Sequence, residues 1–144
     1  MRNTAALLVL ACAAAVGTLV AQSSQPKSST LRIPFESYAL PNGLRVVLAP
    51  NNTSPTVAVT VWYHVGSKNE AKGKTGFAHL FEHVMFTGSG HVPYGVHDRL
   101  TEGVGGSNNG TTSRDRTTYF ETVPSNYLET ALWLESDRMG FLLD

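Results

Sequence analysis

The sequence has little cysteine and no excess of charge of either sign. Cys12 is its only cysteine, and 11 basic side chains balance 11 acidic ones among 144 residues. A single cysteine excludes an intrachain disulfide, so any metal would be held mainly by His, Asp or Glu. The balanced charge gives no indication of a nucleic-acid partner. Apolar residues make up 42% and charged residues 15%, which is typical of a globular chain.

The first residues have the layout of a secretory signal peptide. Arg2 precedes an apolar run from Ala5 to Ala21, and the sequence becomes polar at Gln22. This order predicts a signal peptide over residues 1–21, with cleavage after Ala21. The run is about 17 residues long, the lower limit for a bilayer span, so a membrane anchor through residues 5–21 is the alternative. We therefore expect an exported protein, either periplasmic or secreted.

The rest of the chain divides into a short linker and one folded segment. Residues 22–30 are Ser-rich and polar, which is typical of a linker, and residues 31–144 alternate between strand and helix patterns. Asn42-Gly43 predicts a hairpin turn. Strands are predicted at 57–65 and 117–123, and helices at 75–87, 96–104 and from Ser125 onward. This order predicts an α+β fold, a two-layer sandwich of a largely antiparallel sheet with helices packed on it, incomplete in this chain.

One predicted helix carries two histidines and a glutamate on a single face. Successive helical residues turn by about 100°, so His79, Glu82 and His83 fall side by side. The opposite face is apolar and is predicted to be buried; it contains Phe77, Leu80, Phe81, Val84 and Met85. In the final predicted helix, Leu128, Ala131, Leu132, Glu135 and Met139 follow helical spacing.

This spacing is the inverted zinc-peptidase motif, His-x-x-Glu-His. Histidines at i and i+4 can direct one nitrogen each at a single Zn²⁺, and the carboxylate between them can take a proton from the water that zinc activates. A histidine pair at this spacing also arises by chance, and a lone histidine is usually structural or on the surface. His91 and His97 are expected to have such loop or surface roles, and Trp62 and Trp133 to lie in the core.

The sequence around the motif resembles that of the pitrilysin/insulysin family of zinc peptidases, which includes the mitochondrial processing peptidases. The similar stretches follow one another in the family's order from about Tyr38 to Asp144: residues 40–44, 76–86, 105–112, 119–124 and 132–139.

The resemblance implies a role for each matching residue. His79 and His83 would hold one Zn²⁺ per catalytic domain, and Glu82 would be the general base. The family's substrate-binding edge strand falls on Ser107, Asn108, Asn109, Gly110 and Thr111. Its third zinc ligand is a Glu on a later helix, so we expect that ligand beyond Asp144, with residues 31–144 as the N-terminal part of the catalytic domain.

The resemblance also implies partners: a peptide or protein substrate, and a second homologous half or partner subunit that closes the site. The function expected is that of a zinc-dependent metalloendopeptidase, although this chain alone is expected to be inactive. The alternative is a non-catalytic partner or structural subunit of the same family. The intact His79, Glu82 and His83 favour the peptidase, because inactive relatives typically lose one of these residues.

Overall fold

The computed structural model describes residues 32–142. The predicted signal peptide at 1–21 and the linker at 22–30 lie outside this range. The chain forms two compact units, Met1–Pro50 and Asn51–Asp144. In residues 32–142, no helix combines the length and apolar content that a membrane span requires.

The described part of the first unit is a two-stranded hairpin. Strands β1 (Glu36–Ala39) and β2 (Arg45–Leu48) are antiparallel, with Tyr38 opposite Val46. Gly43 adopts φ +88°, and Asn42 Oδ1 accepts a hydrogen bond from the Leu44 N–H at 3.1 Å. The turn predicted from Asn-Gly is confirmed, because it uses the positive φ that glycine allows.

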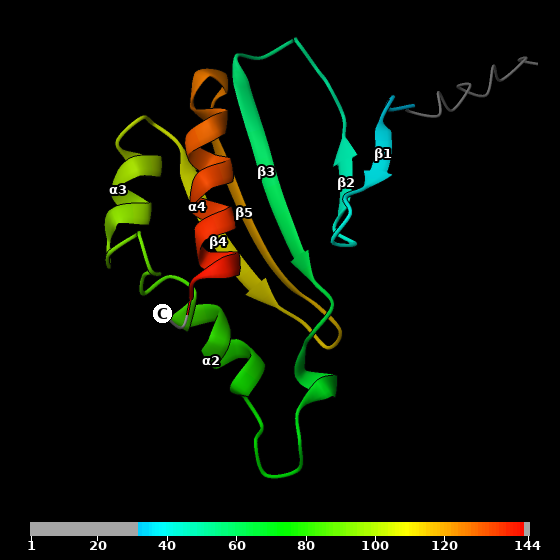
Figure 1. Ribbon diagram of the computed structural model, residues 1–144, viewed down its shortest axis with the longest axis vertical. Coiled ribbons are helices and arrows are strands. Elements are labelled where there is room, and N and C mark those ends of the chain that lie inside the picture. The colour runs from blue at the N-terminus through cyan, green and yellow to red at the C-terminus, as the bar shows by residue number, and fades with distance from the viewer. Residues whose placement is uncertain (1–31, 143–144) are drawn as a thin grey trace, which may run out of the picture. The chain divides into compact units, whose positions relative to one another are not determined.

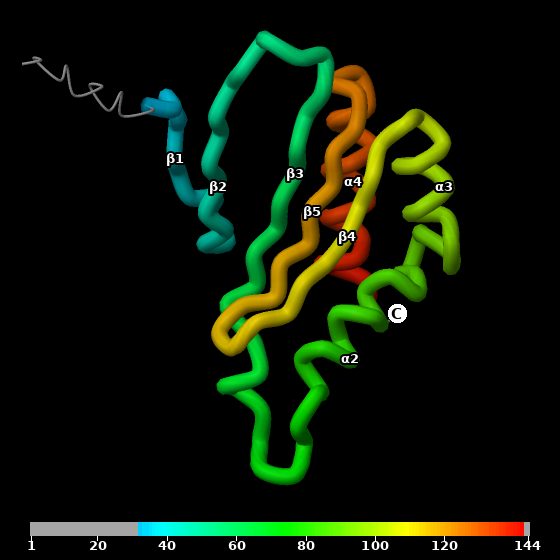
Figure 2. Tube along the Cα trace, turned by 180° about the vertical axis from the view of Figure 1, so that it is seen from behind, coloured from blue at the N-terminus to red at the C-terminus, as the bar shows by residue number. Residues whose placement is uncertain are grey.

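The second unit is built on a three-stranded antiparallel sheet in the order β3-β5-β4 (Figure 2). The strands are β3 (Thr56–Tyr63), β4 (Ser107–Thr112) and β5 (Thr117–Pro124). The central strand β5 pairs with β3 on one side and β4 on the other. Among the described residues, β4 therefore has a free outer edge.

The helices of this unit are α2 (Phe77–Val84), α3 (Val96–Glu102) and α4 (Leu128–Gly140), with short 3₁₀ turns η1 (Ser67–Asn69) and η2 (Ser125–Tyr127). Helix α4 lies in front of the sheet in Figure 1 and behind it in the reversed view of Figure 2, so it covers one face. The strands alternate accordingly: Tyr119 and Val123 are buried beneath the helices, while Phe120 is exposed. The two-layer α+β architecture predicted from the sequence is confirmed.

The two tryptophans do not lie in the core, contrary to the prediction. Trp62 is 67% exposed and Trp133 is 43% exposed. Trp62 lies on the sheet face opposite the helices, where the Arg116 guanidinium lies 5.1 Å from its ring centre. Within residues 32–142, the buried apolar side chains are instead Met85, Val92, Tyr119, Val123, Ala131 and Leu134.

The predicted buried face of α2 is also wrong in part, and the inward face of α4 is partly charged. On α2, Phe77, Leu80 and Phe81 are about half exposed, while Glu82 is buried because it faces β4. On α4, Leu132 and Met139 are exposed, and the inward face contains Ala131, Leu134, Glu135 and Arg138. Glu135 and Arg138 can be buried because they pair with each other.

Candidate metal and catalytic site

Helix α2 begins without a side-chain cap of its own. Gly76 at its N-cap has φ +92° and offers no side chain to the free N–H groups of the first turn. The Glu70 carboxylate supplies the missing acceptors, taking hydrogen bonds of 2.9 Å from both the Gly76 and Ala78 N–H groups. A carboxylate at this position also interacts favourably with the positive end of the helix dipole. This role could not be predicted from the sequence, because Glu70 lies outside the usual capping spacing.

The two histidines of α2 present their ring nitrogens to the same point. His79 Nε2 and His83 Nε2 are 3.1 Å apart, and the ring centres are 4.8 Å apart. Zinc holds nitrogen at about 2.0–2.1 Å, so two ligands of a tetrahedral ion lie about 3.3–3.4 Å apart. Both side chains are exposed and accessible to an ion. The donor pair therefore fits zinc.

Glu82 is 8% exposed and lies against strand β4. Thr112 Oγ1 donates a hydrogen bond to Glu82 Oε2, which fixes the orientation of the carboxylate. A Cβ atom at Gly110 would lie 3.2 Å from Glu82 Cγ, so glycine allows the strand to pass close to the helix. Thr112 was not among the predicted site residues. Its signal is the alternation of the strand, which puts it on the same face as Gly110.

The predicted substrate-binding residues all lie on β4 but on different faces. Asn108 and Gly110 point to the helix side, whereas Ser107, Asn109 and Thr111 are exposed. The Asn108 amide donates to Thr101 Oγ1 at 2.7 Å and so belongs to the contact with α3. The Gly110 N–H donates to Asn109 Oδ1 at 2.8 Å. Of these five residues, Gly110 is the one for which a close approach to Glu82 is observed.

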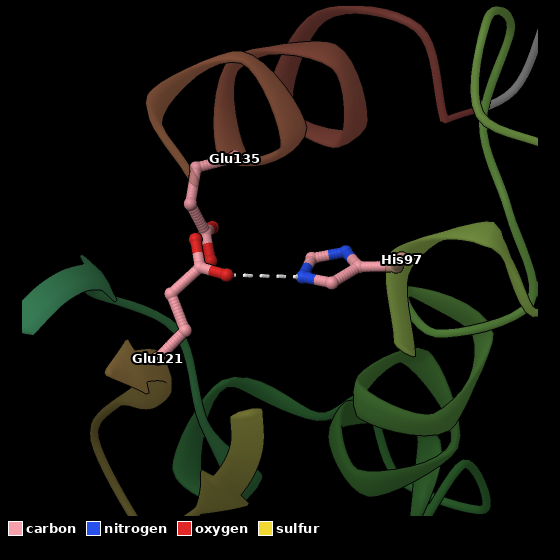
Figure 3. A group of neighbouring side chains, drawn as sticks. All are labelled: His97, Glu121 and Glu135. Atoms are coloured by element: carbon pink, nitrogen blue, oxygen red, sulfur yellow. Dashed lines mark ion pairs between the residues drawn. The ribbon is translucent and has the colours of Figure 1, made fainter. Parts of the chain in front are cut away.

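His91 and His97 differ from each other, although the same role was predicted for both. The His91 side chain is 62% exposed, with its Nδ1 2.6 Å from Asp137 Oδ1. His97, in contrast, is 6% exposed on α3, and its Nε2 lies 3.5 Å from Glu121 Oε2 (Figure 3). The prediction of a loop or surface role for His97 is wrong, because His97 is buried on α3, which packs against β4 and β5.

Comparison with known proteins now decides the family. Residues 45–139 match the model of the family described as Insulinase (Peptidase family M16). The chain belongs to this family. Its predicted relationship to the pitrilysin/insulysin peptidases is thereby confirmed.

Several curated relatives of this M16 chain are named as zinc proteases or processing peptidases. It is 39% identical over 123 residues to the zinc protease PqqE of Helicobacter pylori, covering 85% of this chain and 26% of that protein. It is 37% identical over 98 residues to a probable mitochondrial-processing peptidase subunit beta of Arabidopsis thaliana, covering 68% of this chain and 18% of the relative. The chain thus spans about a quarter or less of the length of these relatives.

Two solved structures have the same fold over most of the M16 chain. A protease from Helicobacter pylori superposes with a TM-score of 0.74 at 38% identity, covering 76% of this chain and 27% of that one. Pitrilysin superposes with a TM-score of 0.72 at 25% identity, covering 85% of this chain and 13% of that one. The likeness therefore extends beyond the helix that carries the motif.

Proposed function

We propose that this chain carries the metal-binding helix and the general base of a zinc-dependent metalloendopeptidase. The observation that supports this most directly is the arrangement on α2: two ring nitrogens 3.1 Å apart and, between them in sequence, a carboxylate held by Thr112. The relatives named as zinc proteases support the same function.

In this proposal each residue has a distinct task. His79 and His83 hold Zn²⁺, which when bound supplies a Lewis acid for a water and a peptide carbonyl. Glu82 accepts the proton of the attacking water at its carboxylate and delivers it to the leaving amine. Thr112 is a positioning residue that keeps Glu82 Oε2 in a fixed orientation. The free edge of β4 aligns the substrate backbone beside Glu82.

The proposed site takes further groups from the full-length protein. A catalytic zinc has three protein ligands, and α2 supplies two of them. We assign the third to a Glu beyond Asp144. A second homologous half or a partner subunit would close the site over a peptide or protein substrate. Relatives named as subunits of mitochondrial-processing peptidase and of the cytochrome b-c1 complex support a paired arrangement. Export through residues 1–21 is also part of the proposal.

Replacing Glu82 with Gln in the full-length protein tests the assignment of the base. The variant is expected to retain zinc, because Glu82 is not a ligand, and to hydrolyse peptides about 10²–10⁴-fold more slowly. Zinc content and cleavage of a quenched fluorescent peptide are measured on the same sample. Glu129→Gln, at an exposed position of α4, is the matched control and should keep the activity.

Two outcomes would contradict the proposal. Wild-type cleavage rates in the Glu82→Gln variant would remove Glu82 from the role of base. A zinc-loaded full-length protein that cleaves no peptide, alone or with its partner, would favour the non-catalytic partner or structural subunit instead.

A further inference from the structure

A second group of possible metal ligands lies away from the α2 histidines, in the interior between the sheet and the helices. His97, Glu121 and Glu135 come from α3, β5 and α4, and one donor atom of each lies within 4.8 Å of the others (Figure 3). We propose that these three side chains form a buried divalent-cation site, with Zn²⁺ as the ion that best fits the donors. One imidazole and two carboxylates are ligands that zinc takes in proteins.

The burial of this cluster is unusually complete for ionisable groups. The exposed fractions are 6% for His97, 1% for Glu121 and 3% for Glu135. Glutamate is almost never fully buried unless its charge is paired or bound to a metal. Among residues 32–142, no group hydrogen-bonds to either carboxylate oxygen of Glu121 or to His97 Nε2. All three of these atoms belong to the cluster and remain free to bind an ion.

The separation between His97 and Glu121 favours a shared ion over a direct hydrogen bond. His97 Nε2 and Glu121 Oε2 are 3.5 Å apart. A hydrogen bond of this type is normally 2.7–3.2 Å long. Two ligands of one tetrahedral zinc at about 2.0–2.1 Å are about 3.3–3.4 Å apart. The observed spacing therefore needs little adjustment to place both atoms around one ion.

Arg138 pairs with the carboxylate of Glu135 but not with that of Glu121. Its guanidinium is paired with Glu135 through both Nε and Nη2, and its centre lies 4.3 Å from the ring centre of Tyr119. Burial raises the pKa of Glu135, and Arg138 opposes that rise. A ligating carboxylate is commonly held in this way by a hydrogen-bond donor behind it. Glu121 has no such partner in the described part of the chain and could bind the ion through both oxygens.

The proposed ion has a structural function rather than a catalytic one. Its ligands come from α3, β5 and α4, so binding would join three elements that are distant in the sequence. Structural zinc sites are closed, whereas catalytic sites keep a position open to substrate. The alternative explanation for the buried Glu121 is a direct ion pair with a protonated His97, which would balance the carboxylate charge without any metal ion.

The test uses the full chain with His79→Ala and His83→Ala, so that the α2 site no longer binds zinc. After incubation with Zn²⁺ and dialysis against a weak chelator, this protein should retain about one zinc per chain. Adding Glu121→Gln should reduce the retained zinc by at least about tenfold. Adding Glu129→Gln instead, at an exposed position on α4, should leave it unchanged. A folded double-alanine protein that retains no zinc would overturn the proposal, as would equal retention in the two Gln variants.

A second measurement needs no change in the cluster, in case Glu121→Gln fails to fold. The double-alanine protein keeps three histidines, at positions 64, 91 and 97. Titration with Zn²⁺ is followed by NMR of the three imidazole rings. Binding as proposed shifts the His97 ring signals and leaves those of His64 and His91 in place. Unchanged His97 signals at saturating zinc would leave the protonated His97 as the explanation.

Discussion

The Glu82 carboxylate is buried, and its one observed side-chain hydrogen bond comes from Thr112. A buried charged group that loses such a donor is left with an uncompensated desolvation cost. The position of the proposed base thus depends on a residue 30 positions later in the chain. The His-x-x-Glu-His motif could be predicted from the sequence because helical spacing is local. Thr112 could not, because its contact arises from the packing of β4 against α2.

Thr112→Val tests this dependence. Valine keeps the branched shape but removes the hydroxyl, so the free energy of unfolding should fall by about 1.5–3 kcal/mol, the usual contribution of a hydrogen bond to a charged group. In the full-length protein kcat should also fall while zinc content is unchanged. Thr111→Val is the control, since Thr111 is exposed on the other face of β4. Equal unfolding curves for the two variants, measured in urea, would show that the hydroxyl has no role.

The ionised carboxylate of Asp137 on helix α4 accepts hydrogen bonds from Ser89 and His91 in the segment before α3. Burial pushes the pKa of Asp137 upward, but hydrogen bonds from Ser89 Oγ and from the ring and N–H of His91 outweigh it and hold the pKa below the ordinary 3.8. A depressed pKa in the folded state means that the unfolded chain binds more protons in acid. The stabilisation is complete above the ordinary value and is lost as the pH falls through the folded pKa.

The expected result is a loss of stability in acid that Asp137→Asn removes. Urea unfolding of the unsubstituted chain should become easier between about pH 5 and pH 2, and the slope over this interval should be smaller in the Asn variant. Asp115→Asn, in the exposed turn between β4 and β5, is the control and should keep the original slope. Identical slopes for all three proteins would contradict the assignment to Asp137.

At the level of single elements, the N-terminus of helix α2 is capped by Glu70, which lies outside the helix. Glu70→Ala removes both acceptors from the first turn, and the loss should be similar to that of an N-cap, about 0.5–2 kcal/mol. Hydrogen exchange should become faster for the amides of α2 while those of α4 stay protected. Lys72→Ala, an exposed change in the same loop, should have neither effect. If the α2 amides keep their protection in Glu70→Ala, the capping role is wrong.

The positions of the elements were predictable, but the packing of their faces was less so. Apolar spacing located α2, α3 and α4 within a few residues, because periodicity and the bounding glycines are properties of the local sequence. The helical spacing located α4 but not its inward face, since Leu128, Leu132 and Met139 are exposed. Arg138 is buried there instead, paired with Glu135 and lying over the ring of Tyr119. Such compensation requires knowing which strand lies beneath the helix.

On the scale of the whole second unit, the order β3-β5-β4 leaves β4 unpaired on its outer side among the described residues. The sequence did not indicate that β3 pairs with β5, because this pairing joins segments that are distant in the chain. The family resemblance predicted an edge strand at Ser107–Thr111, whereas the composition alone, rich in Gly, Asn and Thr, favoured a connecting loop; the structure places β4 at an edge of the described sheet. Glu82 lies beside β4, where it accepts a hydrogen bond from Thr112 and closely approaches Gly110.

If substrate docks along β4 as proposed, a proline on this strand should block it without unfolding the protein. Proline at Gly110 removes the N–H that now donates to Asn109 Oδ1, and proline at Asn109 changes the backbone beside it. The Gly110 N–H faces outward, which is where edge strands tolerate proline, whereas Asn109 and Phe120 form a hydrogen-bonded pair, so proline at Asn109 also removes one bond to β5. We expect a large fall in kcat/KM for both variants of the full-length protein, compared at equal zinc content in protein that circular dichroism shows to be folded. Because a Cβ at Gly110 would lie 3.2 Å from Glu82 Cγ, Gly110→Ala separates crowding of the base from loss of the N–H. Lys72→Pro is the matched control. In the turn around Lys72, the Lys74 N–H donates to the Ala71 carbonyl and Gly73 has φ +84°. This turn geometry accepts proline at the position of Lys72. Wild-type kinetics in both strand variants would exclude β4 as the docking edge and leave the zinc-binding helix without its proposed substrate guide.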